Sequence, residues 1–180
     1  MCVLTRREIA ELIQNGNITD YVDAEMQLQE HGFDVTVRKV YMLKGYGIVD
    51  FDNSMRRLPE YIELEWDENG MLILEKGVYV IEINEVVRLP RDVMAIVLPR
   101  STIIRSGCWL ASAVWDAGYE GRGKLLLYVA KELAITKNAR IGQMVFLKLC
   151  SEVEGYRGTY QGEGIRKRLS FRDVGIERGL

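Results

Sequence analysis

From residue 32 onward the sequence consists of short apolar runs at close spacing, and this pattern constrains the fold more than any other feature. The runs are four to eight residues long and are separated by turn-forming pairs such as Lys76-Gly77 and Leu89-Pro90. Such runs predict β-strands, and a series of them beside a single helix indicates a sandwich or barrel of jelly-roll type. Asp67-Glu68-Asn69-Gly70 predicts a hairpin turn between two of the runs. The predicted strands are 33–37, 61–66, 71–74, 78–83, 93–98, 109–115, 124–129 and 142–149.

The one clear helix precedes these strands. Thr5-Arg6-Arg7-Glu8 fits a capping box, and Gly16 suits the helix end. Ile9, Leu12 and Ile13 recur at helical spacing between them. We therefore predict a mainly β fold with a short N-terminal helix over residues 5–15, while residues 21–30 favour neither helix nor strand.

The composition bounds the class of protein. The chain has 180 residues, of which 48% are hydrophobic and 28% charged, as expected for one globular domain. No apolar run approaches the ~20 residues that a bilayer span needs, so no membrane partner is expected. The formal net charge of -2 argues against a surface that binds nucleic acid broadly.

The scarcity of histidine and cysteine excludes two kinds of chemistry. The chain has one histidine, His31, and three widely separated cysteines, Cys2, Cys108 and Cys150. Structural zinc sites and zinc deaminases need clustered Cys and His ligands, and a histidine-based triad would depend on His31 alone. We expect His31 to be structural or simply exposed. Scattered thiols form no disulfide framework, so we expect a cytoplasmic location.

The end of the chain differs in character from the rest. Residues 155–164 are rich in glycine, and residues 165–169 concentrate positive charge. Such a segment buries little on its own. We predict a domain over residues 1–155 and a flexible Gly/Arg-rich C-terminal arm over 156–180. The arm is either a solvated tail or a segment that closes over an anionic ligand.

Three stretches could carry chemistry, and each also has a purely structural interpretation. Arg100-Ser101 and Arg105 could bind phosphate through guanidinium, hydroxyl and backbone N–H groups, or could be a capped helix start with surface arginines. Asp116 and Tyr119 could supply a general base and a ring face for a sugar, or form an ordinary turn with a packed tyrosine. Asp34 could be solvated, or could support a Mg²⁺ shell.

Taken together and in order, five stretches resemble the five motifs of the trimeric dUTPases, in the dUTPase / dCTP deaminase superfamily. The opening helix, residues 4 to 16, resembles that of the dCTP deaminase branch, so the match is to an archaeal-type dUTPase with a deaminase-like N-terminus. The fifth stretch keeps its tyrosine but lacks the regular motif spacing. The five stretches are Gly32–Val35, Arg100–Ile104, Val114–Gly121, Arg140–Met144 and Arg157–Gly162.

The resemblance implies a distorted jelly roll of the dUTPase-like β-clip type, assembled as a homotrimer with active sites at subunit interfaces. It implies that Asp116 activates the attacking water and that Tyr119 stacks under the deoxyribose. Mg²⁺ is the implied cofactor, with Asp34 supporting its waters from the second shell. The remaining implied substrate-binding residues are Arg100, Ser101, Thr102, Arg105 and Gln143 at the phosphates, Val114 and Trp115 at the base, and Tyr160 over the bound nucleotide.

Residue 126 separates two activities within the superfamily. The deaminases use a glutamate ten positions after the third-motif aspartate, where this chain has Leu126, and no acid lies between Glu120 and Glu132. A leucine cannot transfer a proton, so we predict a dUTP diphosphatase that releases dUMP and pyrophosphate. Two alternatives stay open: a dCTP deaminase, with or without hydrolysis, and a nucleotide-binding paralogue without catalysis.

Overall fold

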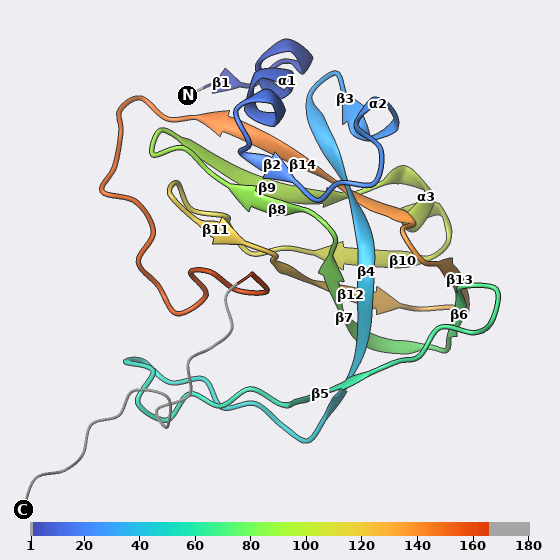
Figure 1. Cartoon of the computed structure of the whole chain (residues 1–180). Helices are drawn as coiled ribbons and strands as arrows, with labels where there is room; N and C mark the ends of the chain where they lie inside the picture. The colour runs from blue at the N-terminus through green and yellow to red at the C-terminus, as the bar shows by residue number, and fades with distance from the viewer. Residues whose placement is uncertain (1, 166–180) are drawn as a thin grey trace, which may run out of the picture.

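The computed structural model describes residues 2–165 and is organised around one long strand (Figure 1). This strand, β4 (Gly32–Lys44), is buried from Gly32 to Val37 and more exposed beyond. Its first half pairs with β14 (Arg140–Lys148), and its second half pairs with β7 (Gly77–Ile83). Register shifts interrupt both pairings, so the sheet curls instead of staying flat. The predicted mainly β, jelly-roll type of fold is confirmed.

The main sheet has nine strands, all paired antiparallel to their neighbours. Its order is β1 (Cys2–Val3), β14, β4, β7, β12 (Lys124–Val129) and β10 (Cys108–Ala111). Off this path, β3 (Leu28–Gln29) and β5 (Glu60–Glu63) pair with β4, and β9 (Val93–Pro99) pairs with β14. Two small sheets complete the fold: β11 (Glu120–Gly121), β8 (Val86–Arg88) and β2 (Ile18–Thr19), and β13 (Leu133–Thr136) with β6 (Met71–Leu74).

Within residues 2–165, three helices lie outside the sheets. The first, α1 (Arg6–Gln14), confirms the predicted helix, because Thr5 and Glu8 form the expected capping box and Ile9 and Leu12 are buried. The others are α2 (Ala24–Gln27), which lies within the stretch that the sequence left undecided, and α3 (Ser101–Arg105). His31, which precedes β4, is exposed.

Two details of the strand prediction are wrong. The turn at Asp67-Gly70 exists, but the strands it joins do not form a hairpin, because β5 pairs with β4 and β6 pairs with β13. The strand predicted over 109–115 ends at Ala111. Beyond it the Trp115 backbone exchanges two hydrogen bonds of 2.9 Å with Ala95, which moves this segment from β12 to β9.

A single core fills the curled sheet. Its fully buried side chains come from α1 and from most of the long strands, including Phe33, Ile81, Leu127 and Phe146. Within residues 2–165, no helix is both long and apolar enough to cross a bilayer. Residues 150–165 return along the edge of the sheet to β11 (Figure 1). The basic run at 166–168, part of the predicted arm, lies outside the described residues.

Candidate active site

A cavity of about 750 Å³ opens where the third-motif stretch, the start of β12 and the C-terminal segment meet. Val114, Trp115, Asp116 and Tyr119 line one side, and Tyr160 lines another. Five residues predicted from the sequence to bind or transform the nucleotide therefore lie around one space. The rest of the lining is Leu58, Pro59, Tyr61, Ala113, Gly123, Lys124, Tyr156, Thr159, Gln161, Gly162, Glu163 and Gly164.

A tight turn presents Asp116 to this cavity. The backbone N–H of Tyr119 donates to the Asp116 carbonyl at 3.0 Å, and Gly118 between them has a φ of 82°. A positive φ at this position favours glycine, since other residues are strained there. Trp115 and Tyr119 on either side are buried, while Asp116 is exposed. The turn thus holds an accessible carboxylate on a rigid base, the geometry that a general base requires.

Aromatic packing fixes the wall next to Asp116. The Tyr119 ring meets Trp115 and Tyr156 edge-on, with centroids 5.2 and 5.7 Å apart. A β-carbon at Gly123 would lie 2.2 Å from the Trp115 ring. Only glycine therefore lets the ring pack against the backbone just before β12. Burial raises the pKa of Tyr119, helped by nearby Glu163, which keeps its phenol neutral at physiological pH.

The C-terminal segment closes the opposite side of the cavity. The Tyr156 N–H donates to the Ala117 carbonyl at 2.8 Å, and the Gly162 N–H donates to the Glu120 carbonyl at 2.7 Å. The guanidinium of Arg56 lies 5.7 Å from the centre of the Tyr160 ring. Residues 156–165 therefore lie against the Asp116 turn of their own chain.

The first, second and fourth motif stretches form a separate cluster around Asp34. Its Oδ2 lies 3.1 Å from Arg100 Nε and 3.3 Å from an Arg140 guanidinium nitrogen, and Gln143 also hydrogen-bonds to the carboxylate. The Asp34 side chain is 2% exposed, whereas both arginines retain about 30% exposure. Burial raises the pKa of Asp34, against the opposing effect of the two guanidinium groups. Asp34 is thus the buried counter-ion that positions two accessible cations.

The remaining predicted residues follow Arg100 directly. Ser101, Thr102 and Arg105 are exposed on α3, whose first residue comes after the β9 strand end. None of these residues, nor Asp34, Arg100 or Gln143, lines the Asp116 cavity. The structure therefore brings the predicted site together in two parts, one at the cavity and one at the Asp34 cluster.

Leu126 occupies the position where a deaminase would carry its acid. It lies on β12 between Ala111 of β10 and Val80 of β7, and its side chain is 40% exposed. It borders a hollow of about 280 Å³ that adjoins the larger cavity and that, within residues 2–165, no carboxylate lines. A pyrimidine base bound there would find no carboxylate among the described lining residues to transfer the proton that deamination requires.

Two residues at these sites were not among the predicted site residues. Lys124 lines both the cavity and the adjoining hollow, and Arg140 shares Asp34 with Arg100. A lone lysine at the start of an otherwise apolar strand was a usable signal for the first. Arg140 opens the fourth motif stretch, but its contact with Asp34 could not be predicted, because the two residues are 106 positions apart in the sequence.

Comparison with known proteins identifies the family to which the chain belongs. A family model described as dCTP deaminase-like matches residues 3–149, so the chain belongs to the dCTP deaminase-like family. It is 53% identical over 168 residues to a probable deoxyuridine 5'-triphosphate nucleotidohydrolase of Archaeoglobus fulgidus, covering 92% of this chain and 99% of that one. It is 41% identical over 150 residues to the deoxyuridine 5'-triphosphate nucleotidohydrolase of Methanocaldococcus jannaschii, covering 81% and 94%.

A solved structure shares the fold. The 2'-deoxycytidine 5'-triphosphate deaminase of Agrobacterium tumefaciens superposes with a TM-score of 0.61 at 22% identity. The match covers 80% of this chain and 46% of that one, so the chain spans about half of that larger protein.

Proposed function

We propose that this chain is a dUTP diphosphatase, which hydrolyses dUTP to dUMP and pyrophosphate. The observation that carries the proposal is the exposed Asp116 carboxylate in the wall of a nucleotide-sized cavity, next to a strand whose position 126 is leucine. The curated relatives named deoxyuridine 5'-triphosphate nucleotidohydrolase support the same substrate. We also propose a cytoplasmic location, which the three free cysteines support.

The residues divide the work between binding and proton transfer. Asp116 takes a proton from the water that attacks the triphosphate, and the Tyr119 ring provides an apolar face for the deoxyribose. Arg100, with Ser101, Thr102 and Arg105 on α3, meets the negative charge of the phosphates. Gln143 adds a polar group beside Arg100, and Tyr160 covers the nucleotide from the C-terminal segment.

A divalent cation fits this site as an ion that arrives with the triphosphate. Within residues 2–165, no three His, Cys, Asp or Glu side chains gather into a cation site. Asp34 already accepts from two arginines through Oδ2 and is 2% exposed, so it could support Mg²⁺ waters only through its other oxygen. Mg²⁺ commonly takes few protein ligands and several phosphate oxygens, and when bound it neutralises charge on the triphosphate. Pyrophosphate release should stop in EDTA and return with added Mg²⁺.

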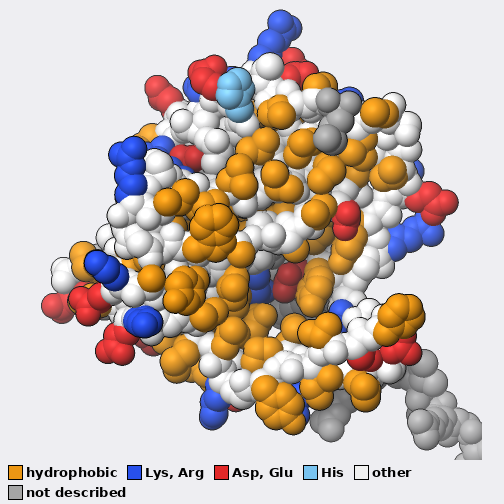
Figure 2. Space-filling view, turned by 180° about the vertical axis from the view of Figure 1, so that it is seen from behind, with side chains coloured by type: hydrophobic (Ala, Val, Ile, Leu, Met, Phe, Trp, Pro, Cys, Tyr) orange, Lys and Arg blue, Asp and Glu red, His pale blue; other side chains and the backbone are white. Residues whose placement is uncertain are grey.

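The two-part site supports a homotrimer with interfacial active sites. The Asp34 cluster and the Asp116 cavity are separate in one chain, so a neighbouring subunit can unite them. Hydrophobic side chains also spread over much of one face of the molecule (Figure 2). The exposed large hydrophobic residues of the described chain include Trp109, Leu126 and Tyr128, on the paired strands β10 and β12. Apolar surface of this extent is typical of a subunit interface.

Subunit mixing tests this arrangement. Asp116→Asn and Arg100→Ala should each abolish pyrophosphate release, the first without loss of nucleotide binding. When the two variants are mixed under conditions that exchange subunits, a shared site regains intact Asp116 and Arg100, and activity returns. Continued inactivity of exchanged oligomers would show that both residues must come from one chain.

A dUTP and a dCTP incubation with product chromatography test the substrate. We expect dUMP and pyrophosphate from dUTP and no ammonia from dCTP, because Leu126 cannot transfer a proton. Near-normal pyrophosphate release by Asp116→Asn would overturn the assigned base.

A further inference from the structure

Lys124 occupies a distinctive place in the cavity wall. It begins β12 and lines both the Asp116 cavity and the adjoining 280 Å³ hollow that Leu126 borders. It is also the one cationic side chain that lines either space among the residues the structure describes. A ligand that extends from the cavity into the hollow must therefore pass its ammonium group.

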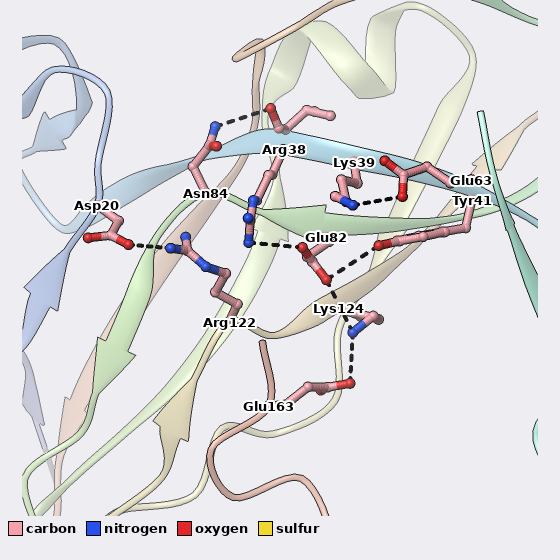
Figure 3. Close-up of polar contacts among 11 residues, drawn as sticks. Asp20, Arg38, Lys39, Tyr41, Glu63, Glu82, Asn84, Arg122, Lys124 and Glu163 are labelled. Carbon is pink, nitrogen blue, oxygen red and sulfur yellow. Dashed lines mark hydrogen bonds and ion pairs between the residues drawn. The ribbon is translucent and has the colours of Figure 1, made fainter. Parts of the chain in front are cut away.

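The ammonium group is held in place by two carboxylates. Lys124 Nζ lies 3.4 Å from Glu82 Oε2 on β7 and 2.8 Å from Glu163 Oε1 in the C-terminal segment (Figure 3). The Glu82 side chain is 9% exposed and is anchored by Arg38 at 3.3 Å and by the Tyr41 hydroxyl at 3.5 Å. Two carboxylates at these distances limit the rotamers of the lysine and hold its ammonium group at the cavity wall.

The hollow beside Lys124 suits a flat, weakly polar ring. Its lining is mainly apolar and includes Val80, Ala111, Leu125 and Leu126 from three adjacent strands. In such surroundings a hydrogen bond to a charged donor discriminates strongly, because a mismatched polar group is left without water or a partner.

We propose that Lys124 selects uracil over cytosine by donating a hydrogen bond to the carbonyl oxygen at pyrimidine C4. This inference rests on the proposed dUTP hydrolysis and names the residue that sets its base preference. An ammonium has three donors and no acceptor. Uracil has a hydrogen-bond acceptor at C4, whereas cytosine has an amino group there. The amino group and the ammonium would both be donors, so no hydrogen bond could form between them.

The backbone alone cannot make this choice as firmly. The segment around Val114 presents both N–H and C=O groups, so small shifts could pair it with either base. Lys124 supplies a donor that no rearrangement converts into an acceptor. Since Glu163 binds the same ammonium, the C-terminal segment and the base would meet at one group when the cavity is filled.

The test compares uracil and cytosine nucleotides with and without the lysine. Binding of dUTP and of dCTP is measured by titration calorimetry in the Asp116→Asn background, and kcat/KM for pyrophosphate release is measured with Asp116 intact. Lys124→Met should lower the dUTP-to-dCTP preference by about 10- to 100-fold in both measurements, mainly through weaker use of dUTP. An unchanged preference would overturn the proposal, even if both nucleotides bind more weakly.

Three further variants keep the outcome clear. Lys39→Met removes another ion-paired lysine, 2.7 Å from Glu63 on the neighbouring strands, and should leave the preference unchanged. Glu163→Gln should weaken both nucleotides alike, because it acts on the C-terminal segment and not on the base. Lys124→Met combined with Glu163→Gln removes the carboxylate whose ion pair the single variant breaks, while Glu82 keeps Arg38, so misfolding of the single variant cannot hide the result.

Failure of this inference is distinguishable from failure of the proposed hydrolysis. If the wild type releases no pyrophosphate from any nucleotide, the hydrolase proposal fails. The calorimetric preference and its loss in Lys124→Met would still report on base selection.

Discussion

Replacement of Gly123 by alanine tests whether the Asp116 cavity depends on close packing of the Trp115 ring against the backbone. An added β-carbon would lie 2.2, 2.5 and 3.0 Å from three atoms of that ring. An ordinary carbon–carbon contact is about 3.6 Å, so the ring must move by about 1.4 Å. Trp115 is 6% exposed and contacts Tyr119, which leaves it little space to do so.

We expect Gly123→Ala to lower the free energy of unfolding by about 1–3 kcal/mol, the usual range for an overpacked core. Because Trp115 precedes Asp116, the displaced ring should also lower kcat/KM for dUTP. Urea denaturation followed by circular dichroism measures the first effect, and pyrophosphate release measures the second.

The matched control is Gly77→Ala. A β-carbon there meets the Tyr79 ring at an ordinary 3.5 Å, so the change in stability should stay within about 0.5 kcal/mol. In a Trp115→Leu background, Gly123→Ala should lose most of its effect, since the ring is gone. A Gly123→Ala protein that unfolds like the wild type and retains its kcat/KM would refute the reasoning.

Two further predictions concern buried carboxylates. Asp34→Ala should lower the free energy of unfolding by about 2–3 kcal/mol in urea denaturation. This is less than the full loss for a buried ion pair, because Arg100 and Arg140 remain partly hydrated. The same variant should raise KM for dUTP, because Arg100 loses its counter-ion. Glu85→Ala should lower stability by about 2–4 kcal/mol, since it strands the donors of Thr36 and Gln27. Burial raises the pKa of Glu85 above its usual 4.5. As the pH falls, the native state therefore binds a proton at Glu85 before the unfolded state does. The advantage of wild type over Glu85→Ala, measured by urea denaturation across this range, should therefore shrink as the pH rises from 4.5 through that raised pKa, and constancy would contradict this.

Local signals in the sequence were enough for the elements that local interactions form. The capping box of α1 and the apolar runs of β6 and β12 involve neighbouring residues, and these elements lie where predicted. The predicted hairpin failed because its turn is tied to other strands. Lys137 donates to the Gly70 carbonyl at 2.8 Å and draws β6 toward β13, while the Leu64 N–H donates to Val40 on β4.

The same distinction separates the predicted site residues from the missed ones. Asp116 and Tyr119 lie three residues apart on one turn, so their association follows from the local sequence. The meaning of Asp34 depends on Arg100 and Arg140, which reach it only through the pairing of distant strands. The sequence therefore predicted a role for Asp34 but could not show that two arginines already bind it.

Environment, not residue type, decides which carboxylate can act as the base. Within residues 2–165, Asp116 and Glu163 are the carboxylates that line the cavity. Glu163 lies 2.8 Å from the Lys124 ammonium, so this carboxylate is already held in an ion pair. Asp34 is buried between cations outside the cavity, and Glu82 is taken by Arg38 and Lys124. Among the described residues, Asp116 is the carboxylate that combines exposure, a rigid turn and access to the cavity, which supports our proposal that it accepts the proton of the attacking water.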